Sequence, residues 1–228
     1  EVIRNAAPKD NFLKKVRELA DKHGSVLIFD ECTTGFRETF GGIHKRYGVE
    51  PDIAVFGKTM GNGYAITAVI GKRSIMDIAQ ETFISSTFWT ERIGPTAALA
   101  TLEVMEKENT GEQIINIGNK VKKGWSKIAD SNNLDILISG IPSLCGFTLK
   151  GNDTQKFRTL ITQEMLKRGY LATTSIYPCL EHSDAIIDNY MNDLNDVFKL
   201  IRSCQDEVNN IDELLDGDVC HTGFSRLN

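Results

Sequence analysis

Residues 25–31 read SVLIFDE, and this stretch decides the fold class. The largely apolar run 25–29 has the length of a strand and ends in two acids, which is typical of a parallel strand buried on both faces. The preceding residues, 10–23, place apolar side chains on one face and predict an amphipathic helix that Gly24 ends. Because a helix, a tight glycine and a buried strand follow one another in α/β proteins, we expect an α/β fold.

Further elements are expected on both sides of a change in pattern near residue 133. Apolar runs and helical periodicity predict strands at 53–56 and 65–70 and helices at 74–80, 92–107 and 112–130. Beyond them, the pattern predicts strands at 136–139 and 144–149 and helices at 154–167 and 184–208, the last capped by Ser183. We therefore expect part of a large α/β domain in residues 1–120, a small α+β domain in 121–210 and a tail in 211–228.

The composition excludes several classes of function. The chain has 228 residues and a net charge of −5, so it offers no basic surface for nucleic acid or for an anionic membrane. No apolar run reaches the roughly 18 residues of a membrane span. The five cysteines are odd in number, widely spaced and without a C-x-x-C pair, which favours free thiols in a cytoplasmic protein. The histidines and cysteines lack the spacing of zinc ligands, so we expect no metal site.

Two polar residues stand where α/β proteins place their active sites. Asp30 follows the run 25–29 and Lys58 follows the run 53–56, so both are expected just beyond the carboxyl ends of buried strands. An acid and a lysine in these positions could form a salt bridge, bind phosphate or serve a cofactor. A Walker A phosphate loop is excluded, because its pattern requires a glycine where Asp52 stands.

The cofactor interpretation rests on a resemblance carried by several motifs. Residues 28–37 read IFDECTTGFR, residues 40–42 read FGG, and residues 56–64 read FGKTMGNGY. Together with PD at 51–52, ST at 86–87 and the helical residues 97–102, these motifs resemble the class-III aminotransferases, which are pyridoxal-phosphate enzymes of fold type I. The resemblance is nearest to the branch of glutamate-1-semialdehyde aminomutase and the polysaccharide-biosynthesis aminotransferases. It is weaker in the last third of the chain, where HSD at 182–184 is still similar.

The resemblance implies roles for individual residues. Lys58 would form the Schiff base with pyridoxal 5'-phosphate and then move the α proton of the substrate, and Asp30 would keep the pyridine nitrogen protonated. Cys32 stands where the family has an aliphatic residue packed on the cofactor ring, so it either touches the ring or belongs to the core. Thr87 matches a threonine that donates a hydrogen bond to the cofactor phosphate across a dimer interface.

Neighbouring residues have less definite roles. Glu31 points away from Asp30 in an extended chain, so we expect it to contact the residues that form the site and not the cofactor itself. Residues 88–92 read FWTER and depart from the Ser-Gly-Asn-Pro sequence that the family often has here. The resemblance therefore does not identify the substrate. Arg92 either binds a substrate carboxylate or begins the next helix, and we favour the helix.

The resemblance also implies that this chain is the C-terminal part of a fold type I transferase that acts as a homodimer. Enzymes of this kind have a long N-terminal portion that binds the cofactor phosphate, stacks on its ring and forms most of the substrate pocket. Nothing before Asp30 serves those purposes here, and residues 1–4 are expected to be the end of a preceding strand. The implied activity is transfer of an amino group between an amino donor and an aldehyde or ketone. The alternatives are an intramolecular 2,1-aminomutase and a truncated chain without catalytic activity.

Overall fold

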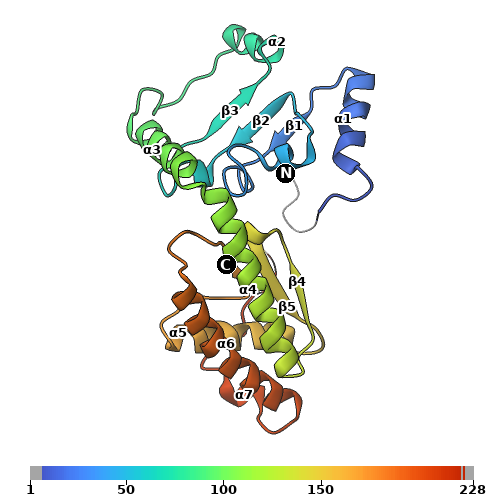
Figure 1. Ribbon diagram of the computed structural model, residues 1–228, viewed down its shortest axis with the longest axis vertical. Coiled ribbons are helices and arrows are strands. Elements are labelled where there is room, and N and C mark those ends of the chain that lie inside the picture. The colour runs from blue at the N-terminus through green and yellow to red at the C-terminus, as the bar shows by residue number, and fades with distance from the viewer. Residues whose placement is uncertain (1–6, 222, 224–228) are drawn as a thin grey trace. The chain divides into compact units, whose positions relative to one another are not determined.

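The computed structural model of the chain describes residues 7–221 and 223 and contains two compact units (Figure 1). The first unit ends at Ile115 and the second begins at Asn116, so the boundary lies inside helix α4 (Thr110–Ser131). The domain boundary expected at residue 120 falls slightly later in the same helix. The strand end expected at residues 1–4 lies outside the described residues.

A three-stranded sheet organises the first unit. Strands β1 (Ile28–Asp30), β2 (Ile53–Phe56) and β3 (Ala68–Gly71) lie side by side in that order (Figure 1). β1 and β2 run parallel, whereas β3 runs antiparallel to β2. The third strand begins later than the predicted 65–70, because the chain first turns after β2. A hydrogen bond from the N–H of Tyr64 to the carbonyl of Gly61 closes that turn.

The two faces of this sheet differ in burial. On one face, Ala54 and Phe56 form a core cluster with Met60 and with Ala98 of helix α3 (Ile93–Glu108). On the other face, Ile28 is 55% exposed and Val69 is 53% exposed. The prediction that the first strand is buried on both faces is therefore wrong for this chain, since β1 buries only Phe29.

The helices of the first unit begin and end close to their predicted positions. α1 (Phe12–His23) ends at Gly24, whose φ of 62° is the left-handed conformation of a helix C-cap. The predicted helix 74–80 is divided into α2 (Arg73–Met76) and a 3-10 helix at Asp77–Glu81. α3 begins directly after Arg92, as favoured from the sequence.

Asp52 ties three elements of the first unit together. Its carboxylate accepts hydrogen bonds from the N–H of Leu27 at 2.8 Å, from Arg17 Nη1 of α1 at 2.8 Å and from Lys72 Nζ at 2.7 Å. The bond from the Leu27 backbone is the largest of the causes that lower the pKa of Asp52, and the two cations add to it. The start of β1, helix α1 and the end of β3 are thus joined at one carboxylate.

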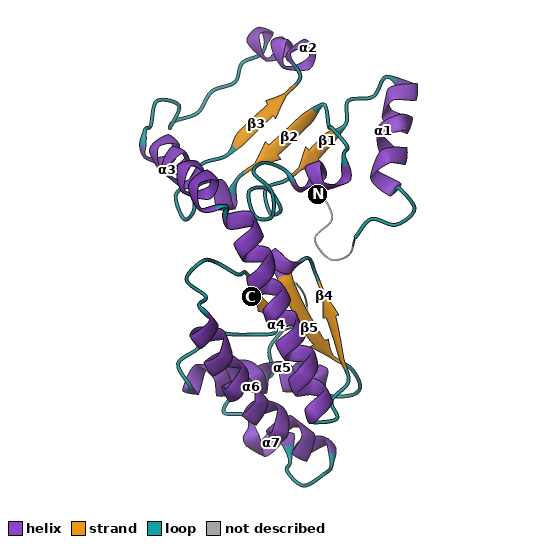
Figure 2. Ribbon diagram, in the orientation of Figure 1, coloured by secondary structure: helices purple, strands orange, loops and turns teal. Residues whose placement is uncertain are grey.

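The second unit packs helices against a small antiparallel sheet (Figure 2). Its strands are β4 (Ile136–Ser139), β5 (Cys145–Leu149) and β6 (Ser175–Ile176). Its helices are most of α4, then α5 (Thr154–Lys167), α6 (Asp184–Gln205) and α7 (Ile211–Leu214). The side chain of Ser183 accepts the N–H of Ile186, so the predicted cap of α6 is confirmed. Residues 211–214 of the expected tail form α7, and Ile211 joins the core.

Aromatic side chains fill the core of the second unit. The rings of Trp125 and Phe147 lie 5.0 Å apart, and those of Phe147 and Phe198 lie 5.6 Å apart. Trp125 is fully buried, and its Nε1 donates to the hydroxyl of Tyr190 at 3.1 Å. No helix in the described part of the chain is long and apolar enough to cross a membrane.

Candidate active site

Asp30 and Lys58 lie at the same edge of the first sheet, as their positions in the sequence predict. Asp30 is the last residue of β1, and Lys58 follows β2 after Gly57. Because β1 and β2 are parallel, both residues leave the carboxyl ends of adjacent strands. The hydrogen bond from the Cys32 backbone is the main cause that lowers the pKa of the Asp30 carboxyl, and the charge of Lys58 adds to it. An acid and an amine are therefore present at this edge of the sheet.

Cys32 holds the Asp30 carboxylate with both its backbone and its side chain. Its N–H donates to Asp30 Oδ1 at 2.9 Å, and its thiol is hydrogen-bonded to the same carboxylate. A Cβ atom placed on Gly57 would lie 3.6 Å from Cys32 Sγ, so the thiol lies over the glycine that precedes Lys58. Cys32 is partly buried beside Asp30, and its contact with the cofactor ring stays a prediction.

Lys58 has an uncommon backbone conformation and is held by a threonine. Its φ of 45° lies in the left-handed region, which costs a non-glycine residue about 1–2 kcal/mol. Strained backbone of this kind is found preferentially at functional sites. Lys58 Nζ donates a hydrogen bond of 2.7 Å to Oγ1 of Thr33, which is only 3% exposed. Sequence reasoning missed Thr33, and the signal that could have found it is its place within the matched motif 28–37.

Glu31 is completely buried behind this edge and anchors the segment that follows β1. It accepts hydrogen bonds from the N–H groups of Ile43 and His44, each at 3.1 Å, and from the hydroxyl of Thr34. The Nδ1 atom of His44 lies 2.8 Å from Glu31 Oε1. Burial alone would raise the pKa of Glu31, but these hydrogen bonds outweigh it and lower the pKa. Glu31 thus fixes residues 31–44 behind Asp30, which agrees with the supporting role expected from the sequence.

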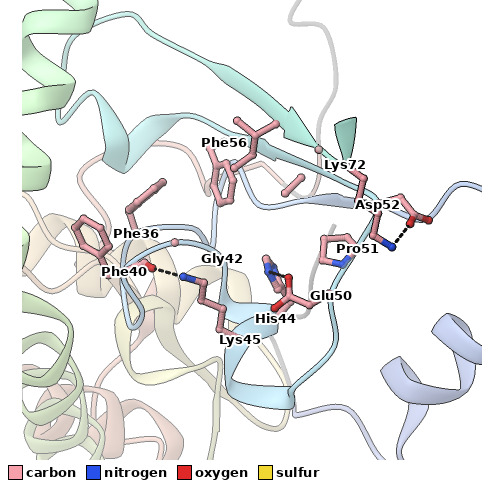
Figure 3. A pocket seen from close by; sticks show the side chains of 14 residues that line it. Phe36, Phe40, Gly42, His44, Lys45, Glu50, Pro51, Asp52, Phe56 and Lys72 are labelled. Atoms are coloured by element: carbon pink, nitrogen blue, oxygen red, sulfur yellow. Dashed lines mark hydrogen bonds and ion pairs between the residues drawn. The ribbon is translucent and has the colours of Figure 1, made fainter. Parts of the chain in front are cut away.

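A hollow of about 600 Å³ lies elsewhere in the first unit (Figure 3). Its lining combines aromatic rings with titratable side chains, namely Phe36, Phe40, Phe56, His44, Lys45, Glu50, Asp52 and Lys72. Both lysines are engaged, Lys45 with the carbonyl of Phe40 and Lys72 with Asp52, as the dashed lines in Figure 3 show. Among the described residues, neither Asp30 nor Lys58 lines this hollow, so it is separate from the acid–lysine pair.

The fourth residue expected in the site, Thr87, lies apart from the others. It is an exposed residue of the loop between the 3-10 helix Asp77–Glu81 and α3, and no hydrogen bond in the described part of the chain joins it to Asp30 or Lys58. Arg92 is exposed as well. The side chain of Glu91 accepts from the first N–H groups of α3, those of Ile93 and Gly94. Sequence reasoning missed Glu91, although an acid beside a helix N-terminus is a recognisable signal.

The residues at the sheet edge fit pyridoxal phosphate, the cofactor that the resemblance implies. The Asp30 carboxylate, whose pKa is lowered, can pair with a protonated pyridine nitrogen, and the amine of Lys58 can react with an aldehyde. The hydroxyl of Thr59, next to Lys58, is buried and has no hydrogen-bond partner among the described residues, so it can still take one. Within the same described residues, no group of three or more His, Cys, Asp and Glu side chains is placed to hold a metal ion.

Comparison with solved structures identifies the fold. The FumI protein of Sphingopyxis sp. MTA144, in its PLP internal aldimine form, matches with a TM-score of 0.82 at 21% identity, over 94% of this chain and 53% of that one. An omega-transaminase from Sphaerobacter thermophilus matches with a TM-score of 0.73 at 20% identity, over 86% of this chain and 49% of that one. The chain therefore has part of the fold type I architecture and spans about half the length of these proteins.

Comparison of sequences identifies the family. The 3-aminobutyryl-CoA aminotransferase of Cloacimonas acidaminovorans (strain Evry) is 36% identical over 157 residues, which are 68% of this chain and 38% of that protein. The family model described as aminotransferase class-III matches residues 5–198. Because this match covers most of the sequence, the chain belongs to the class-III aminotransferases, a family whose cofactor is pyridoxal phosphate.

Proposed function

We propose that this chain carries the lysine-bearing part of an enzyme that transfers an amino group between an amino donor and an aldehyde or ketone. The observation that carries the proposal is that Asp30 and Lys58 lie at the carboxyl ends of two adjacent parallel strands. An acid and an amine at this point are the groups that a pyridoxal-phosphate enzyme needs at the two ends of its cofactor ring.

The proposed roles follow from the chemistry of each side chain. Pyridoxal phosphate, when bound, supplies an aldehyde that takes up amino groups and a pyridine ring that withdraws electrons from the substrate. Lys58 Nζ would hold the cofactor covalently until the amine of the substrate displaces it, and the released Nζ would then take the α proton of the substrate and return it. Asp30 would hold the proton on the ring nitrogen. Cys32, whose N–H donates to Asp30 Oδ1, would keep that carboxylate in place and pack on the cofactor ring.

We assign Thr87 to the cofactor phosphate of a second subunit, so the proposed enzyme is a homodimer. Support comes from the loop that carries Thr87, in which Phe83 is 95% exposed, Phe88 75% and Trp89 68%. Aromatic side chains exposed together in this way mark an interaction surface, and in the proposed homodimer the second subunit covers it. Sedimentation of the active enzyme tests the proposal, and a stable, fully active monomer would overturn it.

The substrates are proposed from the relatives. A coenzyme A thioester of 3-aminobutyrate is the first amino donor to test, because the relative that is 36% identical is named for it. The alternative of a 2,1-aminomutase uses the same lysine and cofactor, and turnover of one substrate without any second amino compound would identify it. We place the protein in the cytoplasm, since none of its five cysteines is joined in a disulfide in the described part of the chain.

Attachment of the cofactor tests the assignment of Lys58. Pyridoxal phosphate is added to the chain, the product is reduced with borohydride, and the modified residue is located by peptide mass spectrometry. We expect the mass increase on Lys58 and none at that peptide in Lys58→Ala. Lys45→Ala is the matched control, because Lys45 lies in the same unit and is bound to the Phe40 carbonyl.

Two outcomes would count against the proposal. Modification of Lys58→Ala at the same yield would show that the cofactor reacts with surface lysines at random. Absence of any attachment in the wild-type chain would favour the alternative of a truncated chain without catalytic activity.

A further inference from the structure

A buried hydroxyl holds the amine of Lys58. Lys58 Nζ donates to Thr33 Oγ1 at 2.7 Å, and Thr33 is 3% exposed although the lysine itself is an exposed residue. The contact joins the segment after β1 to the segment after β2 through side chains alone. It therefore fixes where the Lys58 amine lies relative to the segment after β1.

The segment that presents this hydroxyl is fixed on both sides. The backbone carbonyl of Thr33 accepts from Arg37 Nε at 2.6 Å, and the next residue, Thr34, is bound to the buried carboxylate of Glu31. A threonine has few accessible rotamers because it is branched at Cβ. A lysine side chain is long and flexible, so the fixed partner in this contact is Thr33 and the adjustable partner is Lys58.

We propose that Thr33 is a positioning residue that holds the Lys58 amine at the sheet edge where the cofactor is bound. The inference rests on the proposed function, in which Lys58 Nζ is the reacting atom. A hydroxyl accepts a hydrogen bond from an ammonium group and donates one to a neutral amine. Thr33 can therefore hold the nitrogen in both protonation states that a proton-transferring lysine passes through. Valine has the same shape and can do neither.

Three variants of the chain separate this role from a structural one. Thr33→Val removes the hydroxyl, and Thr33→Ser restores it on a smaller side chain. Thr39→Val is the matched control, since its hydroxyl belongs to the same segment but bonds the carbonyl of Gly42 at 2.9 Å. Thermal melting by circular dichroism establishes that each variant is folded.

The first measurement uses no cofactor. Each folded variant is treated with a limiting amount of acetic anhydride, and acylation of Lys58 is compared with that of Lys14, an exposed lysine of α1. We expect Lys58 in Thr33→Val to react roughly fivefold faster than in the wild type, the order of effect of one lost hydrogen bond. Thr33→Ser and Thr39→Val should stay close to the wild type. Equal rates in Thr33→Val and the wild type would overturn the inference.

The second measurement adds pyridoxal phosphate and traps it on Lys58 with borohydride over a series of times. We expect attachment to be several-fold slower in Thr33→Val, with the wild-type rate recovered in Thr33→Ser. An unchanged attachment rate in Thr33→Val would also overturn the inference. Absence of attachment in every chain, with the acylation difference intact, would instead overturn the proposed function and leave the contact between Thr33 and Lys58 established.

Discussion

The Nδ1 atom of His44 lies 2.8 Å from Oε1 of Glu31, and both residues are buried, at 4% and 0% exposure. Glu31 directly follows Asp30, so this contact fixes the end of the strand that carries the acid of the candidate site. In Glu31→Gln, the new amide NH₂ would face groups that themselves donate hydrogen bonds. We expect the free energy of unfolding to fall by about 2–4 kcal/mol, because buried donors lose their acceptor. Urea denaturation measures the change.

The control for Glu31 is the second carboxylate near His44. Glu50 Oε2 lies 3.8 Å from His44 Nε2, and the Glu50 side chain is 75% exposed. Glu50→Gln should change the free energy of unfolding by no more than about 0.5 kcal/mol. Equal destabilisation by the two substitutions would contradict the anchoring role of Glu31.

Asp52 should make the stability of the chain depend on pH. The folded protein lowers the pKa of Asp52, so its stabilising contribution is complete above the ordinary aspartate pKa of about 3.9 and is lost as the pH falls below it. In Asp52→Asn the charge is absent, and we expect a loss of about 1–3 kcal/mol at pH 7. Urea denaturation at pH 7, 5 and 3 should show a smaller loss of stability on acidification in this variant than in the wild type.

Asp21 offers the comparison for Asp52, because it binds the same arginine. Asp21 Oδ1 lies 2.7 Å from Arg17 Nη2, but the Asp21 side chain is 64% exposed. An exposed ion pair of this kind contributes little, so Asp21→Asn should be close to neutral. If Asp52→Asn and the wild type lose the same amount of unfolding free energy between pH 7 and pH 3, a carboxylate other than Asp52 is responsible for the loss of stability in acid.

Much of the fold could be predicted because its signals are local. The end of α5 near Gly169 and the start of α6 after Ser183 follow from capping residues and helical periodicity. The places of Asp30 and Lys58 are local in the same sense, since Asp30 directly follows one apolar run of strand length and Lys58 follows another after Gly57. Two short runs and the parallel order of their strands were enough to bring the pair to one edge of the sheet.

The contacts that hold the site could not be predicted, because they join residues that are distant in sequence. Thr33 binds Lys58, and Glu31 binds the backbone of residues 43–44, and no spacing rule connects such positions. The burial of β1 was misjudged for a related reason. An apolar side chain such as Ile28 indicates a preference for burial, but it does not tell whether the covering element lies in the same chain.

Asp30→Asn tests the electrostatic part of the proposed mechanism. The carboxylate stays ionised at neutral pH, because its pKa is lowered by the Cys32 backbone and by Lys58. A neutral amide cannot hold the proton on the cofactor nitrogen, so the variant should still attach pyridoxal phosphate at Lys58 but react at least about 100-fold more slowly with an amino donor. Single-turnover absorbance measures the rate, with the exposed Asp77→Asn as control. Near wild-type kinetics in Asp30→Asn would remove this carboxylate from the mechanism.

Tyr190→Phe tests the core of the second unit. Trp125 is fully buried, and its Nε1 donates to the Tyr190 hydroxyl at 3.1 Å, so the variant leaves an indole N–H without its acceptor. We expect a loss of about 1–3 kcal/mol in the free energy of unfolding.

Burial raises the pKa of Tyr190 to about 12, so the wild type should lose stability as the pH rises above the ordinary tyrosine pKa of about 10. Tyr190→Phe should lose less stability over the same range. Tyr170→Phe is the control, because the Tyr170 hydroxyl donates to the Asp193 carboxylate and supports no buried donor. Urea denaturation at pH 7 compares the two variants, and an equal loss in both would exclude a specific role for the bond between Trp125 and Tyr190. The comparison at pH 11 is made between Tyr190→Phe and the wild type.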